Sequence, residues 1–251
     1  MKKIIDKNTA LVIVQLINNE TGVIQPIDEI KLLVESNNTN FLCDGTQAVG
    51  KYAFSVEDLG CNFFSCSSHK FHGPSGTGIL WTNEAKNNLY PLIPGGSQEH
   101  GIRGGTHNVL GIVGAGVAAI VKKDNIEKSL NYISALRNDF EMSLLKKIPN
   151  LSINGESASR VCNTTNVQFR DINGKALFLR LIDSNILCSQ SSSCTAQYPE
   201  PSKTLTAMGL TFDEAFNSIR FSFSELNSNE QVFRATRRIA DLYNLLKNKN
   251  F

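Results

Sequence analysis

The chain has 251 residues, of which 41% are hydrophobic and 19% charged, and its formal net charge is +2. This length and composition are enough to bury a sizeable core, in one large domain or two smaller ones. The near-neutral charge, with lysines and arginines spread along the chain, gives no indication of a nucleic-acid partner.

The N-terminal apolar residues are interrupted at Asp6, a pattern that argues against a signal peptide. The apolar run 110–121 is too short to span a bilayer, so we expect no membrane insertion and instead predict a tightly packed, buried helix there. The six cysteines lack the spacing of a small disulfide scaffold. We therefore expect a cytoplasmic protein with reduced thiols.

The first third of the sequence predicts a strand, a helix and a second strand. Residues 10–17 form an apolar, β-branched run that is typical of a strand buried on both faces, and it leads into Asn18 and Asn19. A helix is expected after Pro26, with one apolar face that consists of Ile27, Ile30, Leu33 and Val34. The next strand, 40–43, leads into Asp44. This order indicates a parallel βαβ unit, in which polar residues after the strands are candidate ligand-binding residues.

Residues 63–81 predict a strand, a polar segment around Lys70, a Gly/Pro turn and a second strand at 79–81. We expect Lys70 to be poorly solvated, because burial lowers the pKa of a lysine and makes its amine a candidate nucleophile for imine formation. The alternative is a solvated lysine in a turn. Cys61, Cys66, His69 and His72 also suggest zinc by residue type, but their short spacing argues against a metal site.

A glycine-rich loop at 94–106 leads into a helix expected from about residue 108. Glycine loops before a helix sometimes hold phosphate, although most are surface loops. From about residue 125 the pattern changes to a long amphipathic helix, with Ile126, Leu130, Ile133, Phe140 and Leu144 on one face. We therefore predict two domains, 1–124 and 125–251.

The second half predicts short strands at 151–153, 165–169 and 186–188, and a helix at 175–182. A capping box at Ser228 to Gln231 predicts the start of the final helix. We expect this helix to turn Val232, Phe233, Ile239, Leu242, Leu245 and Leu246 inward.

Two further residues in the second half are candidates for chemistry. Cys194 lies in a run of small polar residues that indicates an exposed loop, where a thiol can ionise, whereas Cys43, Cys66 and Cys162 have apolar surroundings typical of inert core residues. Arg220 lies in an alternating strand. Its planar fork suits a carboxylate, and the alternative is an ordinary salt bridge.

Six segments, in one order, resemble the cysteine desulfurases of the NifS/IscS group, which are class V aminotransferase-like enzymes dependent on pyridoxal 5'-phosphate (PLP). The segments cover nearly the whole chain: 18–26, 44–50, 67–78, 95–106, 191–202 and 218–222. The resemblance implies an α/β fold: a partial fold-type-I PLP-transferase large domain, with a mostly parallel sheet and helices, and a small C-terminal α+β domain that carries the catalytic-cysteine loop.

The resemblance also implies a role for each matching residue. Lys70 corresponds to the lysine that binds PLP, Asp44 to the carboxylate at the pyridine nitrogen, and Cys194 to the catalytic thiol. The other positions implied are Asn19 and Gln47 at the ring hydroxyl, His69 at the ring or as a proton shuttle, Ser67 at the phosphate, and Thr106 at the phosphate of the partner subunit in a homodimer. Arg220 is implied at the substrate carboxylate, and Asn19 is implied at the substrate as well. This sequence has His100 where the family has arginine, and Ser191-Ser192-Ser193 where the family has Gly-Ser-Ala.

The implied activity is conversion of L-cysteine to L-alanine, with a persulfide formed on Cys194 and passed to a sulfur-acceptor protein for iron-sulfur cluster assembly or thio-modification. The family has an N-terminal part ahead of the Asn-Asn-Glu segment, which this sequence lacks, so we expect an uncovered apolar sheet edge and a separate chain that supplies the missing part. Two alternatives stay open. One is a truncated non-catalytic homologue that binds a partner, and the other is a selenocysteine lyase or aminotransferase that does not need Cys194.

Overall fold

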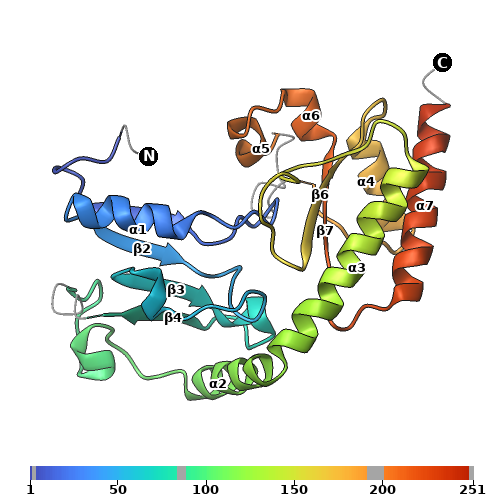
Figure 1. Ribbon diagram of the computed structural model, residues 1–251. Coiled ribbons are helices and arrows are strands. Elements are labelled where there is room, and N and C mark those ends of the chain that lie inside the picture. Colours follow the sequence, from blue (N-terminus) through green and yellow to red (C-terminus); the bar gives the residue numbers. More distant parts are fainter. Residues whose placement is uncertain (2–3, 84–88, 191–200, 249–251) are drawn as a thin grey trace. The chain divides into compact units, whose positions relative to one another are not determined.

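The computed structural model describes residues 1, 4–83, 89–190 and 201–248 (Figure 1). The chain divides into two compact units, each described here by itself. The first unit comprises Met1–Ile17 and Gln25–Ile126, and the second comprises Asn18–Ile24 and Glu127–Phe251. The short segment 18–24 thus packs with the C-terminal half of the chain, although it lies early in the sequence.

The first unit contains a four-stranded sheet in the order β1-β2-β3-β4 (Figure 1). The first three strands are parallel to one another, and β4 is antiparallel to β3. The elements of this unit are β1 (Leu11–Gln15), α1 (Ile27–Ser36), β2 (Asn40–Asp44), η1 (Glu57–Leu59), β3 (Phe63–Ser67), η2 (Ser68–Phe71), β4 (Gly78–Thr82), η4 (Gln98–Gly101) and α2 (Val109–Asp124). The predicted parallel βαβ unit is confirmed, with α1 connecting β1 to β2.

The outer strand β1 corrects one prediction from the sequence. Leu11 is 42% exposed and Ile13 is 64% exposed, so β1 is not buried on both faces. The two exposed side chains alternate with the buried Val12, so they lie on one face of β1 that is left uncovered among the described residues. β1 is also an edge strand of the sheet and pairs there with β2 alone. Leu80 on the opposite edge strand, β4, is also half exposed. Apolar side chains are therefore exposed on both outer strands of the sheet among the described residues.

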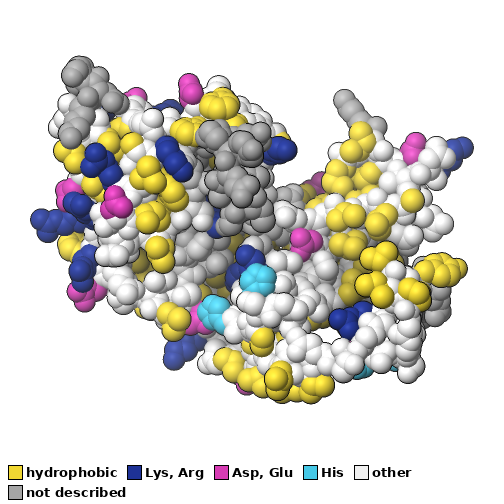
Figure 2. All heavy atoms as spheres, turned by 180° about the vertical axis from the view of Figure 1, so that it is seen from behind, with side chains coloured by type: hydrophobic (Ala, Val, Ile, Leu, Met, Phe, Trp, Pro, Cys, Tyr) yellow, Lys and Arg dark blue, Asp and Glu magenta, His cyan; other side chains and the backbone are white. Residues whose placement is uncertain are grey.

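Helix α2 corrects a second prediction, because most of its apolar residues are exposed rather than buried. Only Gly111 and Ala115 are buried. Gly111 and Gly114 form a narrow packing face, since an added Cβ would lie 2.3 Å from Oγ1 of Thr77 and 2.6 Å from Cγ of Pro74. We call the remaining exposed side chains the α2 apolar face: Val109, Leu110, Ile112, Val113, Val117, Ile120 and Val121. Figure 2 shows hydrophobic side chains gathered along the lower edge, where α2 lies.

No helix within the described residues is long and apolar enough to cross a membrane.

The second unit has a three-stranded antiparallel sheet in the order β5-β6-β7. Its elements are α3 (Ile126–Lys147), β5 (Ser152–Ile153), β6 (Thr164–Gln168), α4 (Gly174–Asp183), α5 (Lys203–Ala207), α6 (Phe212–Phe216), β7 (Ser218–Ser222) and α7 (Asn229–Lys247). Side chains of the sheet and of α3, α4 and α7 share one core, in which Leu136, Val167, Phe169, Leu177, Ile219 and Tyr243 are fully buried. The division of function between domains 1–124 and 125–251 stays a prediction.

Helix α7 begins where the sequence predicts, with a reciprocal capping box between Ser228 and Gln231. Its inward face is narrower than expected, because Phe233 and Leu245 are exposed. The predicted strand at 186–188 is also wrong. Only Ser189 forms a bridge, with Arg220, because the chain reaches β7 at that single point.

Candidate functional site

Two parallel strands of the first unit end side by side with polar residues. Asp44 ends β2 and Ser67 ends β3, and the register pairs Asp44 with Ser65. The half-buried Asp44 carboxylate accepts a hydrogen bond through Oδ1 from the backbone N–H of Thr46, at 2.9 Å. The acid therefore lies at the carboxyl edge of the sheet, where α/β proteins bind ligands.

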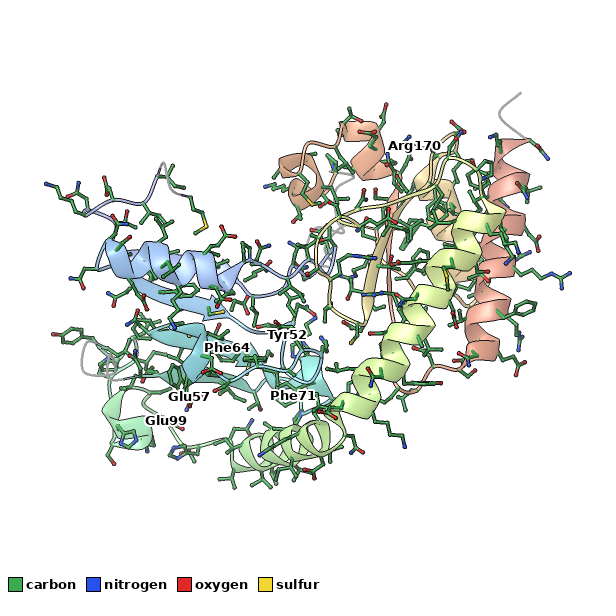
Figure 3. All side chains as sticks on the ribbon, viewed as in Figure 1. Tyr52, Glu57, Phe64, Phe71, Glu99 and Arg170 are labelled. Atoms are coloured by element: carbon green, nitrogen blue, oxygen red, sulfur yellow. The ribbon has the colours of Figure 1, made fainter. Side chains whose placement is uncertain are left out.

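The turn after Asp44 depends on Gly45. An added Cβ at this position would lie 1.9 Å from Cζ of Phe64, so only glycine fits against the buried ring (Figure 3). Gln47 follows in the same turn, and its Oε1 accepts a hydrogen bond from Nζ of Lys51 at 3.0 Å. Lys51 was not singled out by the sequence analysis, because a lysine four residues after a glutamine is an ordinary helical-turn spacing.

The turn that carries Lys70, η2, is anchored by its neighbours. Ser68 and Phe71 are buried, and Figure 3 shows Phe71 beside α2. The N–H of Ser68 donates to the carbonyl of Thr77 at 3.0 Å, the N–H of Gly73 donates to the carbonyl of Ser68 at 2.8 Å, and the Ser68 hydroxyl donates to the carbonyl of Pro74. The backbone of Lys70 is thereby held at the end of β3.

The side chain of Lys70 is exposed, so the prediction of poor solvation is wrong for the described chain. The reason is local geometry, because η2 uses Ser68 and Phe71 as its buried anchors and turns His69 and Lys70 outward. His69 is oriented by Ser67, whose Oγ lies 2.9 Å from Nδ1 of the imidazole. That hydrogen bond occupies Nδ1 and leaves Nε2 as the second polar atom of the ring.

The cysteines of the sheet are core residues. Burial raises the pKa of the Cys43 thiol to about 12, with further contributions from Cys61 and Asp44. Burial and the nearby Asp44 carboxylate raise the pKa of the Cys66 thiol to about 11. Cys162 is buried too, so the prediction of core cysteines is confirmed. Across the described part of the chain, no group of three or more His, Cys, Asp or Glu residues could hold a metal ion.

In the second unit, Arg220 and Asn19 lie together. Nη1 of Arg220 donates to the backbone carbonyl of Asn19 at 2.8 Å, and Nη2 donates to Oγ of Ser189 at 3.1 Å. Burial lowers the pKa of the Arg220 guanidinium, and the negative charge of Glu20 partly offsets this effect. The guanidinium is therefore half-buried and held in one orientation by two acceptors from distant parts of the sequence.

The segment 18–24 that brings Asn19 to Arg220 is a tight turn. Oδ1 of Asn18 accepts from the N–H groups of Glu20 and Thr21, at 2.9 and 3.0 Å. Gly22 has a φ of 76°, a left-handed conformation that favours glycine. The sequence predicts Asn18 as a candidate ligand-binding residue after the first strand, whereas in the structure its side chain holds the turn. The signal for its role is an asparagine four residues ahead of Gly22 at the end of a predicted strand, since asparagine side chains often accept from the backbone N–H two residues on in an Asx turn.

The second unit also contains a buried ion pair beneath this turn. Nη1 and Nη2 of Arg160 donate to Oε1 and Oε2 of Glu141, at 2.7 and 2.9 Å. Burial tends to raise the pKa of the Glu141 carboxyl, but the hydrogen bonds and charge of Arg160 outweigh it and lower the pKa. Arg160 also bridges the backbone of Val23. The ion pair therefore supports the strand-like segment that holds residues 18–24.

Two predicted site residues are not joined to these groups. Thr106 is exposed in the glycine-rich loop of the first unit. Cys194 lies outside the described residues, as does the rest of 191–200. Cys188, six residues earlier, is half-buried, and burial raises its pKa to about 12. The structure thus gathers Asp44, Gln47, Ser67, His69 and Lys70 in the first unit, and Asn19 and Arg220 in the second.

Asp44 and Lys70 follow neighbouring parallel strands. This arrangement is typical of α/β proteins that bind a ligand at the carboxyl edge of the sheet. The family model "Aminotransferase class-V" matches residues 1–234. The chain therefore belongs to the class-V aminotransferase family, whose members typically depend on PLP.

Curated relatives carry the name that the sequence resemblance indicates. The chain is 39% identical over 240 residues to a cysteine desulfurase from Nostoc sp., with 96% of this chain and 60% of that protein covered. It is 34% identical to the cysteine desulfurase NifS of Azotobacter vinelandii, again over 96% of the chain and 60% of the relative. The resemblance to this group is confirmed, and the chain spans about 60% of the length of these relatives.

Solved structures show the same similarity. A NifS-like protein matches with a TM-score of 0.87 and 32% identity, over 98% of this chain and 64% of that one. A structure described as SspA in complex with cysteine matches with a TM-score of 0.75 and 33% identity, over 90% of this chain and 62% of the other. The fold of the described chain is therefore that of NifS-like proteins.

Proposed function

We propose that this chain carries the cofactor lysine, the ring carboxylate and the substrate clamp of a PLP-dependent cysteine desulfurase. The observation that supports this most directly is the carboxyl edge of the first-unit sheet. Asp44 and the Ser67-to-Lys70 turn follow two adjacent parallel strands, so a carboxylate, a hydroxyl, an imidazole and an amine share one edge. This is the set of side chains that PLP chemistry uses.

The donor set fits the chemical groups of PLP. When bound, PLP supplies an aldehyde that condenses with amines and an aromatic ring that withdraws electrons from the attached substrate. In the proposal Lys70 holds the aldehyde carbon, and Asp44 keeps a proton on the pyridine nitrogen. Gln47 and Asn19 bind near the ring hydroxyl, Ser67 binds the phosphate, and His69 lies at the ring. The exposure of Lys70 and His69 leaves both accessible to a ligand.

The substrate is proposed to be L-cysteine, with its carboxylate on Arg220. As a free amine, Lys70 would take the α-proton at Nζ. The thiolate of Cys194 then forms a bond with the substrate sulfur while the carbon–sulfur bond breaks. The atoms balance as L-cysteine plus a Cys194 thiol giving L-alanine plus a Cys194 persulfide. A sulfur-acceptor protein would take the sulfur onward. The match to a structure described as bound to cysteine supports this choice of substrate.

A homodimer is part of the proposal. The α2 apolar face is exposed over seven large side chains, an area of the kind that marks protein interfaces. Thr106 lies in the loop just before α2 and is exposed, which suits its proposed contact with the cofactor phosphate of a second copy.

The exposed apolar surface also favours a second candidate function, in which the chain acts only when bound to another polypeptide. Leu11, Ile13 and Leu80 expose both edge strands, and edge strands pair readily with further strands. In that case the chain alone does not form the cofactor site.

The two candidates are separated by the visible absorbance spectrum of the purified chain with added PLP, before and after borohydride reduction. If the chain forms the cofactor site, an absorbance band appears that reduction fixes covalently to the protein. Lys70→Ala abolishes this band, whereas Lys146→Ala, a change of an exposed lysine on α3, leaves it unchanged. The desulfurase activity is then lost in Cys194→Ala, while the band is retained.

A band that persists in Lys70→Ala contradicts the proposed role of this lysine. Absence of any band in the unmodified chain contradicts the first candidate and supports the second. Full desulfurase activity in Cys194→Ala would instead favour a PLP enzyme such as a selenocysteine lyase or an aminotransferase.

A further inference from the structure

Glu20 is a buried acidic residue to which neither the sequence analysis nor the proposed function gives a role. It is only 6% exposed, and its Oε2 has no hydrogen-bond partner among the described residues. A buried carboxylate oxygen without a partner is unfavourable, because it has lost its water and gained nothing in return. An opposite charge nearby offsets part of this cost.

Arg220 has the complementary feature. Its Nε is buried and likewise has no acceptor among the described residues. Glu20 and Arg220 belong to the same compact unit, and the charge of Glu20 acts on the guanidinium. Two buried groups of opposite charge, each with one unpartnered atom, therefore lie in one region of the second unit.

Hydrogen bonds hold the backbone of Glu20 in place, and they therefore fix where its Cβ lies. The N–H of Glu20 donates to Oδ1 of Asn18 at 2.9 Å, and its carbonyl accepts from Nδ2 of the buried Asn166 at 3.3 Å. The preceding residue, Asn19, accepts from Nη1 of Arg220. Within this turn, the carbonyl of Asn19 therefore accepts from Arg220, and the carboxylate of the next residue, Glu20, is buried inside the second unit.

The donors of Arg220 can be accounted for one by one. Arginine has five N–H donors: one on Nε and two on each Nη. One donor on Nη1 binds Asn19, one on Nη2 binds Ser189, and Nε is enclosed. One donor on each Nη therefore remains, and this pair matches the two oxygens of a carboxylate.

We propose that Glu20 is a positioning residue for Arg220: its buried carboxylate is the counter-charge that keeps the guanidinium in place beside the 18–24 turn, so that the two remaining Nη donors face a bound carboxylate. This inference rests on the proposed function, in which Arg220 binds the substrate carboxylate. Glu20 itself touches no substrate, because its unpartnered oxygen is enclosed.

The test uses the full chain labelled with ¹⁵N-arginine. The Nε–H resonance of Arg220 is assigned by its disappearance in Arg220→Lys, and its exchange rate with water is measured. Glu20→Gln removes the charge at nearly constant shape, and Glu156→Gln is the matched control at an exposed glutamate of the same unit. We expect Glu20→Gln to speed exchange by about tenfold or more and the control to change it by less than about twofold, since loss of the counter-charge frees the guanidinium.

An exchange rate in folded Glu20→Gln equal to that of the control overturns the proposal. If Glu20→Gln does not fold, Glu20→Asp decides, because it keeps the charge but shortens its reach by one methylene. A faster exchange in that variant supports the positioning role, and an unchanged rate overturns it.

Titration with L-alanine, the product of the proposed reaction, tests the function separately. If L-alanine leaves the Arg220 resonance unmoved while Glu20→Gln speeds exchange, the positioning role stands and the substrate role of Arg220 fails. The reverse pattern retains the substrate role and removes Glu20 from it.

Discussion

The two sheets of this chain differ in how they are covered. The antiparallel sheet of the second unit shares a continuous core with α3, α4 and α7, and its central strand β6 is buried along its whole length. The mostly parallel sheet of the first unit leaves Leu11 and Ile13 exposed on one edge strand, and α2 leaves seven large apolar side chains exposed. The sheet of the second unit is thus covered by helices of the same unit, whereas the first unit leaves these apolar side chains exposed among the described residues.

The candidate site residues follow the same division. Those of the first unit lie at an open sheet edge, where Lys70 and His69 are exposed. Those of the second are held internally, since Arg220 has two acceptors and a buried Nε. We therefore expect the Arg220 guanidinium to be held in the isolated chain as it is here, and the surroundings of Lys70 to be the part that changes most when the chain binds a partner.

The difference in burial between the two units is tested most strongly by truncating one large apolar side chain in each. Phe169→Ala removes a fully buried ring from the second core and is expected to lower the free energy of unfolding by about 4 kcal/mol. Leu110→Ala removes a side chain that is 87% exposed, and a change below about 0.5 kcal/mol is expected. Urea unfolding followed by circular dichroism measures both. Equal losses would show that α2 is covered in solution.

The ion pair of the second unit provides a second test. Arg160→Met leaves the Glu141 carboxylate buried without its partner and is expected to lower the free energy of unfolding by about 3 kcal/mol at neutral pH. The double variant with Glu141→Met is expected to regain most of that loss, because no buried charge is left. If the double variant is as unstable as the single one, the loss reflects packing rather than charge.

The pH dependence of the same pair has a definite sign. The pKa of Glu141 is lower in the folded chain than its ordinary value of 4.5, so its contribution to stability is present above that value and lost as pH falls through the folded pKa. Thermal unfolding from about pH 6 down to about pH 3 measures this. Arg160→Met is expected to flatten the profile below pH 4.5, and an unchanged profile would contradict the assignment.

Gly45→Ala is expected to have an intermediate effect, and it acts on the well-packed interior of the first unit. The new Cβ would overlap the buried ring of Phe64, so we expect a loss of about 2 kcal/mol in the free energy of unfolding. Gly76→Ala is not a suitable control, since Gly76 has a positive φ. Gly116→Ala on α2 is the matched control, because an added Cβ there meets open space. A similar loss in both variants would contradict the packing argument.

The smallest expected effect concerns the capping box of α7. Ser228→Ala removes the acceptor of the Gln231 N–H, and we expect a loss of about 1 kcal/mol in the second unit. Ser224→Ala, whose hydroxyl accepts from Leu226 in a loop, is the comparison variant. Hydrogen exchange at the first turn of α7 reports the difference, and equal protection in both variants would argue against a stabilising cap.

Much of the fold was predictable from local pattern. The strands ending at Asp44 and Ser67, the turn at Lys70 and the cap at Ser228 are encoded in short stretches of sequence, and the structure agrees with each. Which apolar side chains are exposed to solvent was not predictable in the same way. The residues of α2 and β1 are apolar, and the sequence pattern says that they favour burial but does not say which surface covers them.

Contacts between distant residues were also beyond local pattern. Asn19 and Arg220 are 201 positions apart, and Ser189 reaches the same guanidinium from a third segment. The resemblance assigned Asn19 and Arg220 to one substrate, but their direct hydrogen bond depends on the packing of 18–24 with the C-terminal half. No periodicity within 18–24 indicates that association.

The buried cysteines of the sheet have a consequence for chemical selectivity. With pKa values of about 11 and about 12, the thiols of Cys66 and Cys43 are ionised at pH 7 in roughly one molecule in 10⁴ and one in 10⁵. Since sulfane sulfur and alkylating reagents both react with the thiolate, these two positions would neither capture transferred sulfur nor take up a label at an appreciable rate. The thiols of Cys43 and Cys66 are therefore expected to stay unmodified by such reagents at neutral pH.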